Sequence, residues 1–172
     1  MALHLALNGF HVFMVDLEGH GFSGGTRIVQ LSVEQFHHSV SVLMEQVPED
    51  LPCFLYGHSM GGLTVNTYLG LNPKIADRLA GVIYSAPFFG FPAHLNFDFA
   101  KKTMMSLGAN VLGEFVLCPP NPLHKVCSSK VYQRVMLNDR KSNPFFAMKL
   151  ASSFVRNIDI VGNYAHEIRY PY

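Results

Sequence analysis

The sequence has 172 residues, of which 49% are hydrophobic and 15% are charged, and its formal net charge is +1. This length is typical of one domain, and the high apolar fraction predicts a buried core and excludes a disordered chain. The absence of a basic run argues against nucleic acid as a partner.

The cysteines and the opening residues give weaker indications of location. Cys53, Cys118 and Cys127 are odd in number and lack metal-ligand spacing, which favours a reduced, cytoplasmic protein without a bound metal. No apolar run reaches the length of a membrane span. The first seven residues lack a basic region and a cleavage site, so they are predicted to be helical and not a signal peptide.

The first elements are a helix, a strand and a glycine-rich loop. Residues 2–8 are predicted to end a helix at Asn8-Gly9, and the apolar run 10–15 predicts a strand that ends at Asp16. A loop with Gly19, His20 and Gly21 follows. We expect His20 to be a structural residue that fixes this loop, with a functional role as the alternative.

A second helix follows Ser32, which forms a capping-box pattern with Gln35. Apolar residues at 33, 36, 40, 43 and 47 predict one buried helix face, and Pro48 ends the helix. His37 and His38 fall beside this stripe. We expect both to face solvent and neither to bind a metal.

The motif Gly57-His58-Ser59-Met60-Gly61-Gly62 lies between a short apolar run at 53–56 and a helical pattern that extends to about residue 71. Such a five-residue Gly-x-Ser-x-Gly pattern also arises by chance, but the strand before it and the helix after it predict a nucleophile elbow. We expect side chains at Gly57 and Gly61 to collide with neighbouring segments, which would require glycine at both positions. Ser59 would then lie at a helix N-terminus, where developing negative charge is stabilised.

A third strand is predicted at 81–86, so the order is strand, helix, strand, helix, strand. This order predicts an α/β fold with a three-stranded parallel sheet flanked by helices. After Pro87 the chain carries a phenylalanine cluster at 88–99 and an apolar helix at 145–158. These segments could form an apolar lid or pack into the ordinary core.

Three motifs together resemble the α/β-hydrolase superfamily, and more narrowly the monoacylglycerol lipase and lysophospholipase group with its serine aminopeptidase S33-type domain. The motif around Ser59 is the first. The segment Asp16–Ser23 is similar to the group's Asp-x-x-Gly-His-Gly-x-Ser loop, and Gly81–Pro87 is similar to the strand after the elbow helix. The resemblance implies a partial α/β-hydrolase core at 1–88, a helical apolar cap at 89–165 and the start of the next core strand at 166–172.

The resemblance also implies roles for individual residues. Ser59 would be the nucleophile, and the backbone N–H of Met60 would donate to the oxyanion. The remaining motif positions would be structural, and they are Gly57, His58, Gly61 and Gly62 in the elbow and Gly19, His20 and Gly21 in the preceding loop. We expect His58 to point away from the Ser59 Oγ, toward the sheet interior or a neighbouring loop.

In this family the catalytic Asp and His follow the cap, and no residue of this chain is assigned to either role. The chain therefore resembles the middle of a hydrolase, apparently truncated at both ends, and alone it is expected to be inactive. Asp139 or Asp159 with His166 would satisfy the family's chain order, and His94 and His124 lie in the cap. These substitutes are disfavoured because they lie in lid or linker segments and not at strand ends.

The resemblance implies a serine hydrolase of carboxylic esters, of the monoacylglycerol or lysophospholipid lipase type, that acts through an acyl-serine intermediate. It implies no cofactor, a small lipid ester as substrate, and peripheral membrane contact through the cap. The alternative is a non-catalytic α/β-hydrolase-like protein that binds a lipid or a partner. The sequence does not indicate the oligomeric state.

Overall fold

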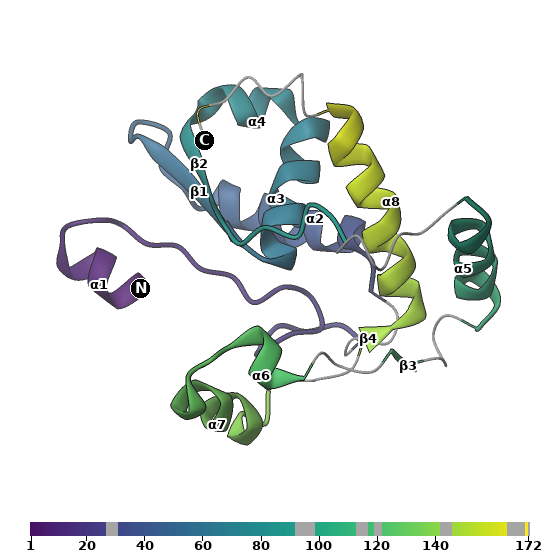
Figure 1. The fold of residues 1–172 in the computed structure, drawn as a ribbon. Coiled ribbons are helices and arrows are strands. Elements are labelled where there is room, and N and C mark those ends of the chain that lie inside the picture. The colour runs from purple at the N-terminus through teal and green to yellow at the C-terminus, as the bar shows by residue number, and fades with distance from the viewer. Residues whose placement is uncertain are drawn as a thin grey trace.

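The computed structural model describes residues 1–26, 31–91, 99–112, 117–118, 122–141, 146–164 and 171, and every structural statement below concerns this part of the chain. Figure 1 shows its helices and strands. In chain order they are α1 (Ala2–Leu7), α2 (Val33–Glu45), β1 (Cys53–His58), α3 (Met60–Leu71), α4 (Pro73–Arg78), β2 (Leu79–Ser85), α5 (Phe99–Leu112), β3 (Leu117–Cys118), α6 (Leu123–Val126), α7 (Lys130–Asn138), β4 (Phe146–Ala147) and α8 (Met148–Tyr164).

The central sheet is a parallel pair of strands, β1 and β2, in which Leu55 lies opposite Val82 and His58 lies opposite Ser85. Helices α3 and α4 connect the two strands, as a parallel pair requires. Burial alternates along β1, so that Leu55 packs under α3 while the Phe54 side chain on the other face is 57% exposed. The predicted α/β class with a parallel sheet is therefore confirmed.

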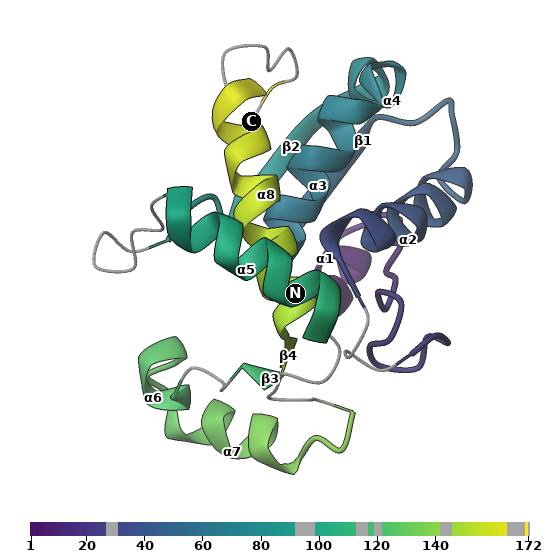
Figure 2. The same cartoon turned by 90° about the vertical axis from the view of Figure 1, so that its right-hand side faces the viewer.

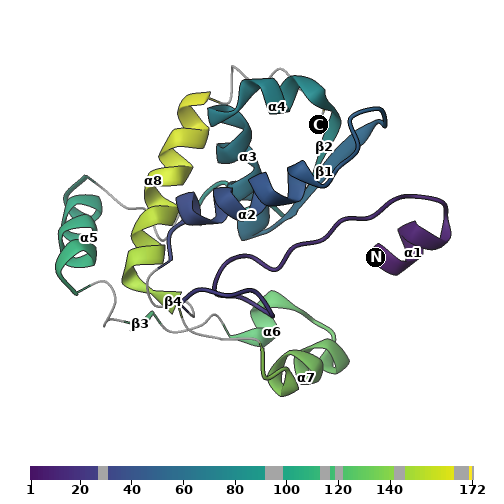
Figure 3. The ribbon, with the colours of Figure 1, turned by 180° about the vertical axis from the view of Figure 1, so that it is seen from behind.

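The predicted strand at residues 10–15 does not form. This segment has no strand partner among the described residues, and it lies apart from β1 in Figures 1 and 3. Phe10 is 58% exposed and Met14 is 76% exposed. An apolar run of this kind is suited to a buried sheet surface, and no neighbouring strand among the described residues offers one here. The described parallel sheet therefore has two strands and not three; β3 and β4 form a separate short antiparallel pair.

Helix α2 follows the predicted pattern, with one correction. The Ser32 N–H donates to the Gln35 Oε1 at 2.8 Å, and Val33, Phe36 and Val40 are buried. The prediction that His37 faces solvent is wrong, because α3 packs against this flank of α2. The His37 ring is half-buried, with its Nε2 2.9 Å from the Thr67 Oγ1 and its plane edge-on to Tyr68.

Two apolar clusters make up the described core. The first lies between the sheet and helices α2 and α3. The second forms where α8 packs against α2 and α3, and it joins Phe36, Leu63, Leu150 and Phe154. Phe88 belongs to its margin, with its ring centroid 5.3 Å from that of Phe154. Figure 2 shows α8 beside α3. Of the two roles considered for the apolar helix, lid or core, core packing accounts for this face of α8.

The far end of the chain approaches the outer edge of β2. The Val82 N–H donates to the Pro171 carbonyl at 2.8 Å. Residues 165–170 and 172 lie outside the described part, so the predicted start of a core strand at 166–172 stays a prediction. The boundary between core and cap at residues 88 and 89 also stays a prediction, since α8 shares a cluster with α2 and α3.

Candidate active site

Ser59 occupies a strained turn between β1 and α3. Its φ is 51° and its ψ is −119°, a conformation that residues with a Cβ rarely adopt. Such a backbone costs on the order of 1–3 kcal/mol and persists only where the surroundings hold it in place. The strand–turn–helix geometry agrees with the predicted nucleophile elbow.

Hydrogen bonds hold this turn against the end of β2. The Ser59 N–H donates to the Ser85 carbonyl at 3.1 Å, and the Ser59 carbonyl accepts the N–H of Phe88 at 3.0 Å. Between these two partners, Ala86 also has a positive φ, of 43°. The two segments with unusual backbone therefore brace each other.

The glycines of the motif have different steric roles. A Cβ at Gly57 would lie 2.8 Å from the Gly61 carbonyl oxygen, and a Cβ at Gly62 would lie 2.7 Å from the Cβ of Pro87. A Cβ at Gly61 would meet no atom within 4 Å. The expectation for Gly57 agrees with this geometry, whereas that for Gly61 is wrong: the second close approach falls one residue later, where α3 passes the turn after β2.

The residues on either side of Ser59 are His58, the last residue of β1, and Met60. His58 is exposed, and its Nδ1 lies 3.2 Å from the Ser85 Oγ, which directs the ring toward the end of the adjacent strand. Met60 is the first residue of α3. The first N–H groups of a helix have no partner within the helix, and the oxyanion role of the Met60 N–H stays a prediction.

The loop with Gly19, His20 and Gly21 is held by local contacts. Gly19 and Gly21 have positive φ values of 72° and 50°. The His20 Nδ1 lies 3.0 Å from the Glu18 carbonyl oxygen, and its ring lies edge-on to Phe36 with centroids 5.5 Å apart. These contacts support a structural role for His20.

No catalytic partner for Ser59 is evident in the described part of the chain, where no hydrogen bond joins its Oγ to a histidine or carboxylate. Asp139 lies at the end of α7, Asp159 on α8 and His124 on α6, and all three are exposed. His94 and His166 lie outside the described residues. Over the same residues, His, Cys, Asp and Glu form no group of three that could hold a metal ion.

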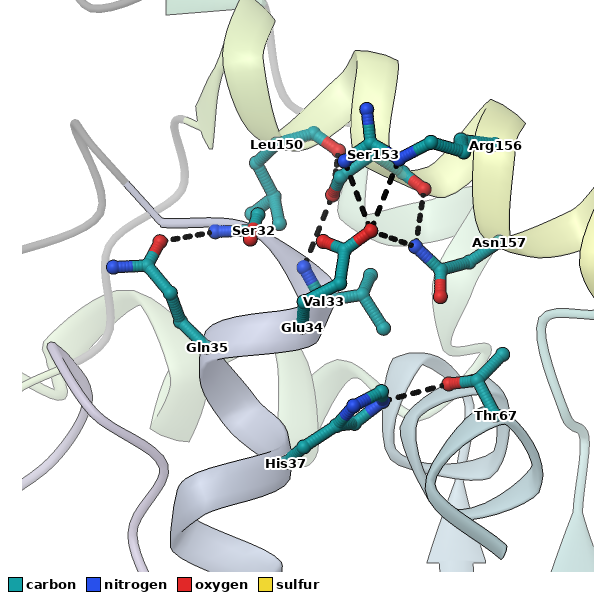
Figure 4. A network of polar contacts seen from close by, with 10 residues as sticks. All are labelled: Ser32, Val33, Glu34, Gln35, His37, Thr67, Leu150, Ser153, Arg156 and Asn157. Carbon is teal, nitrogen blue, oxygen red and sulfur yellow. Dashed lines mark hydrogen bonds and ion pairs between the residues drawn. The ribbon is translucent and has the colours of Figure 1, made fainter. Parts of the chain in front are cut away.

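A polar network that the sequence did not reveal joins α2 to α8 (Figure 4). The Glu34 Oε1 accepts from the Arg156 Nε at 3.0 Å and Nη2 at 2.9 Å, and from the Asn157 Nδ2 at 3.0 Å. Beside it, the Val33 N–H donates to the Ser153 Oγ at 3.1 Å. The network thus joins the first turn of α2 to the middle of α8.

Burial and hydrogen bonding shift the pKa values of two side chains in this region. Burial by itself would raise the pKa of Glu34, but the hydrogen bonds to its carboxylate outweigh burial, and the pKa lies below its ordinary value of 4.5. For His37, burial lowers the pKa below 6.5, against the opposing charge of Glu34. Near neutral pH, Glu34 is therefore ionised and His37 is neutral.

The comparison with protein families decides the identity of this architecture. A family model described as serine aminopeptidase, S33, matches residues 1–172. The chain belongs to this family. The S33-type domain that the motifs around Ser59 predicted is therefore confirmed.

Relatives of the S33 chain include two lipid hydrolases by name. The chain is 34% identical over 108 residues to the phospholipase YtpA of Bacillus subtilis, a match that covers 61% of this chain and 39% of the relative. It is 26% identical over 149 residues to the monoglyceride lipase of Saccharomyces cerevisiae, which covers 83% of this chain and 47% of that protein. The chain therefore spans less than half the length of either relative.

Solved structures show the same fold. The Paleococcus ferrophilus monoacylglycerol lipase superposes with a TM-score of 0.81 at 24% identity, over 98% of this chain and 63% of that one. A soluble variant of the Saccharomyces cerevisiae monoglyceride lipase, in complex with a substrate analog, gives a TM-score of 0.72 at 22% identity, over 95% and 55% of the two chains. The arrangement around β1, α3 and β2 is therefore that of an α/β-hydrolase.

Proposed function

We propose that this S33-family protein hydrolyses carboxylic esters through an acyl-enzyme on Ser59. The observation that carries the proposal is the positive φ of Ser59 at the junction of β1 and α3. Glycine adopts such a backbone without strain, whereas serine does not. A serine at this position is therefore expected to have a role for its hydroxyl. The match to the S33 family favours a catalytic role for this hydroxyl.

The reaction would proceed in two steps. The Ser59 Oγ attacks the ester carbonyl carbon and loses its proton, while the Met60 N–H donates to the oxyanion. The alcohol leaves with a proton, and water then cleaves the acyl-serine to release the acid and restore the hydroxyl. No residue of this chain is assigned as the general base or as the acid that orients it, and the chain alone is expected to be inactive.

The proposed substrate is a small lipid ester, a monoacylglycerol or a lysophospholipid. The support is the named activity of the Saccharomyces cerevisiae and Bacillus subtilis relatives. A caffeoylshikimate esterase of Arabidopsis thaliana, 37% identical over 90 residues, keeps a smaller polar ester open as the alternative substrate. We propose that the protein acts in the cytoplasm and at a membrane surface. None of the described helices combines the length and apolarity that a bilayer crossing requires.

The test measures labelling by a fluorophosphonate probe and hydrolysis of monoolein, lysophosphatidylcholine and p-nitrophenyl acetate. The full-length protein that contains these residues is compared with its Ser59→Ala variant, and Ser85→Ala is the control for a neighbouring serine. We expect Ser59→Ala to abolish labelling and turnover and Ser85→Ala to retain labelling. Labelling that survives Ser59→Ala would refute the assignment, and lipid binding without any Ser59-dependent turnover would favour the non-catalytic alternative.

A further inference from the structure

The strained backbone of Ser59 is held by one short segment, residues 85–88, which begins at the last residue of β2. The Ser59 N–H donates to the Ser85 carbonyl at 3.1 Å, and the Ser59 carbonyl accepts the N–H of Phe88 at 3.0 Å. A strained backbone persists only where its surroundings hold it in place. The position of Phe88 therefore affects how well the conformation of Ser59 is kept.

The pairing of β2 with β1 does not extend to Phe88, because it ends at Ser85. Ala86 then leaves the extended conformation, with a positive φ of 43°. Pro87 follows, and a proline has no N–H with which to form a backbone hydrogen bond. The packing of the half-buried Phe88 side chain is therefore important for the position of its N–H.

The Phe88 ring contacts two other aromatic rings. It lies edge-on to Phe91, with centroids 5.2 Å apart and planes at 82°, and edge-on to Phe154, at 5.3 Å and 84°. This edge-to-face arrangement is a preferred geometry of aromatic pairs. Phe91 follows closely in the same segment, whereas Phe154 lies on α8 and is buried in a cluster with Phe36 and Leu63. Phe154 is therefore the contact that fixes Phe88 relative to the core.

Helix α8 is itself anchored close to Phe154. Arg156 and Asn157 bind the Glu34 carboxylate of α2, and Figure 4 shows these contacts. On the other side of Phe154, Leu150 packs into the same apolar cluster. Anchors on both sides restrict the rotation of α8 about its axis and with it the direction of the Phe154 ring. A continuous series of contacts thus runs from α2 through α8 and Phe88 to the Ser59 carbonyl.

We propose that Phe154 is a positioning residue for the nucleophile: its ring holds Phe88, whose N–H holds the Ser59 carbonyl. The inference rests on the proposed function, since it concerns the reaction of Ser59. In this role Phe154 acts through the backbone of Ser59 and not through the acyl group of the ester. Loosening the Phe88 ring lets the turn relax, so that fewer molecules hold the Ser59 Oγ in the geometry for attack. The resulting loss is therefore the same for short and long acyl chains.

The test compares Phe154→Leu with the parent in the full-length protein, because leucine keeps an apolar side chain but removes the ring pair. We expect kcat/KM to fall by about three- to ten-fold, the size of one lost aromatic pair. The factor should be the same for p-nitrophenyl acetate and for monoolein. The rate of labelling by a fluorophosphonate probe should fall equally, although labelling still goes to completion. A side chain that contacted the acyl group would instead affect monoolein and leave the acetate unchanged.

A second variant tests whether the effect passes through Phe88. Phe88→Leu should slow labelling as Phe154→Leu does. The double variant should be no slower than either single variant, because both substitutions remove the same contact. Phe88 is only half-buried, so Phe88→Leu also carries the test if Phe154→Leu does not fold.

Val161→Ala is the matched control, since Val161 is buried in the same cluster further along α8. It should lower the urea midpoint without slowing the labelling of Ser59. Labelling of Phe154→Leu or Phe88→Leu at the parent rate would overturn the proposal. So would a loss confined to monoolein, additive losses in the double variant, or equal slowing by Val161→Ala. Labelling that persists in Ser59→Ala is a separate result, which contradicts the proposed function itself.

Discussion

At the scale of single residues, the turn around Ser59 requires glycine at the positions where neighbouring atoms leave no room for a Cβ. Gly57 faces the first turn of α3, and Gly62 faces Pro87, whereas the position of Gly61 is open. The motif alone could predict the turn, because its residues are consecutive. It could not show which glycine is crowded, because Pro87 reaches Gly62 only after the chain has passed through α4 and β2.

The three glycines give a prediction with an internal control. Gly57→Ala and Gly62→Ala should each lower the free energy of unfolding by roughly 1–3 kcal/mol, because the new methyl group overlaps backbone or Pro87 atoms. Gly61→Ala should cause no loss, since its methyl meets open space. Urea denaturation of the three variants measures the difference. A loss for Gly61→Ala as large as for the other two would contradict this account of the turn.

At the scale of elements, local signals predicted α2 and α3 well, and non-local contacts were missed. The cap and apolar face of α2 lie within the helix itself, so the sequence could indicate them. Pairing of residues 10–15 requires a neighbouring strand, which no local pattern specifies. The Glu34–Arg156 pair joins residues 122 positions apart, and neither residue belongs to a motif that would have revealed it.

The Glu34 network gives a prediction in pH. Because the folded-state pKa of Glu34 lies below 4.5, its contribution to stability is full above that value and is lost as the pH falls through the folded-state pKa. Glu34→Gln should therefore reduce the urea midpoint at neutral pH, and the difference from the parent should shrink on acidification. Both partners are partly exposed, so we expect a modest effect that salt reduces further.

The matched control is Glu45→Gln at the exposed end of the same helix. It removes one carboxylate from α2 but leaves the contact with α8 intact. A difference between Glu34→Gln and the parent that persists unchanged at acidic pH would show that the carboxylate charge is not what joins α2 to α8.

At the scale of the whole molecule, α8 belongs to the same packed unit as the elbow helix. Leu150 and Phe154 share a cluster with Phe36 of α2 and Leu63 of α3. Sequence reasoning predicted the apolar helix but could not distinguish a lid from core, because both require a strongly apolar face. Whether the apolar face of α8 belongs to a lid or to the core depends on which helices pack against it, and here these are α2 and α3.

This arrangement predicts one cooperative unfolding transition for the described core. Phe154 is 9% exposed, and Phe154→Ala should cost about 3–5 kcal/mol and shift the signals of α8 and of the sheet together. Leu107→Ala on α5, where the side chain is 63% exposed, serves as the control and should change stability little. Separate transitions, with the sheet unaffected by Phe154→Ala, would instead favour a lid that folds apart from the core.

The backbone of Ser59 sets two kinds of selection against each other. At φ 51° and ψ −119°, glycine would relieve the strain, whereas serine would keep the hydroxyl. A library randomised at codon 59 and sorted only for folded protein should therefore accumulate glycine. The same library, made in the full-length protein and selected for growth on an ester as carbon source, should keep serine. The ratio of the two enrichments would measure what the hydroxyl contributes to fitness on that ester, without purified protein.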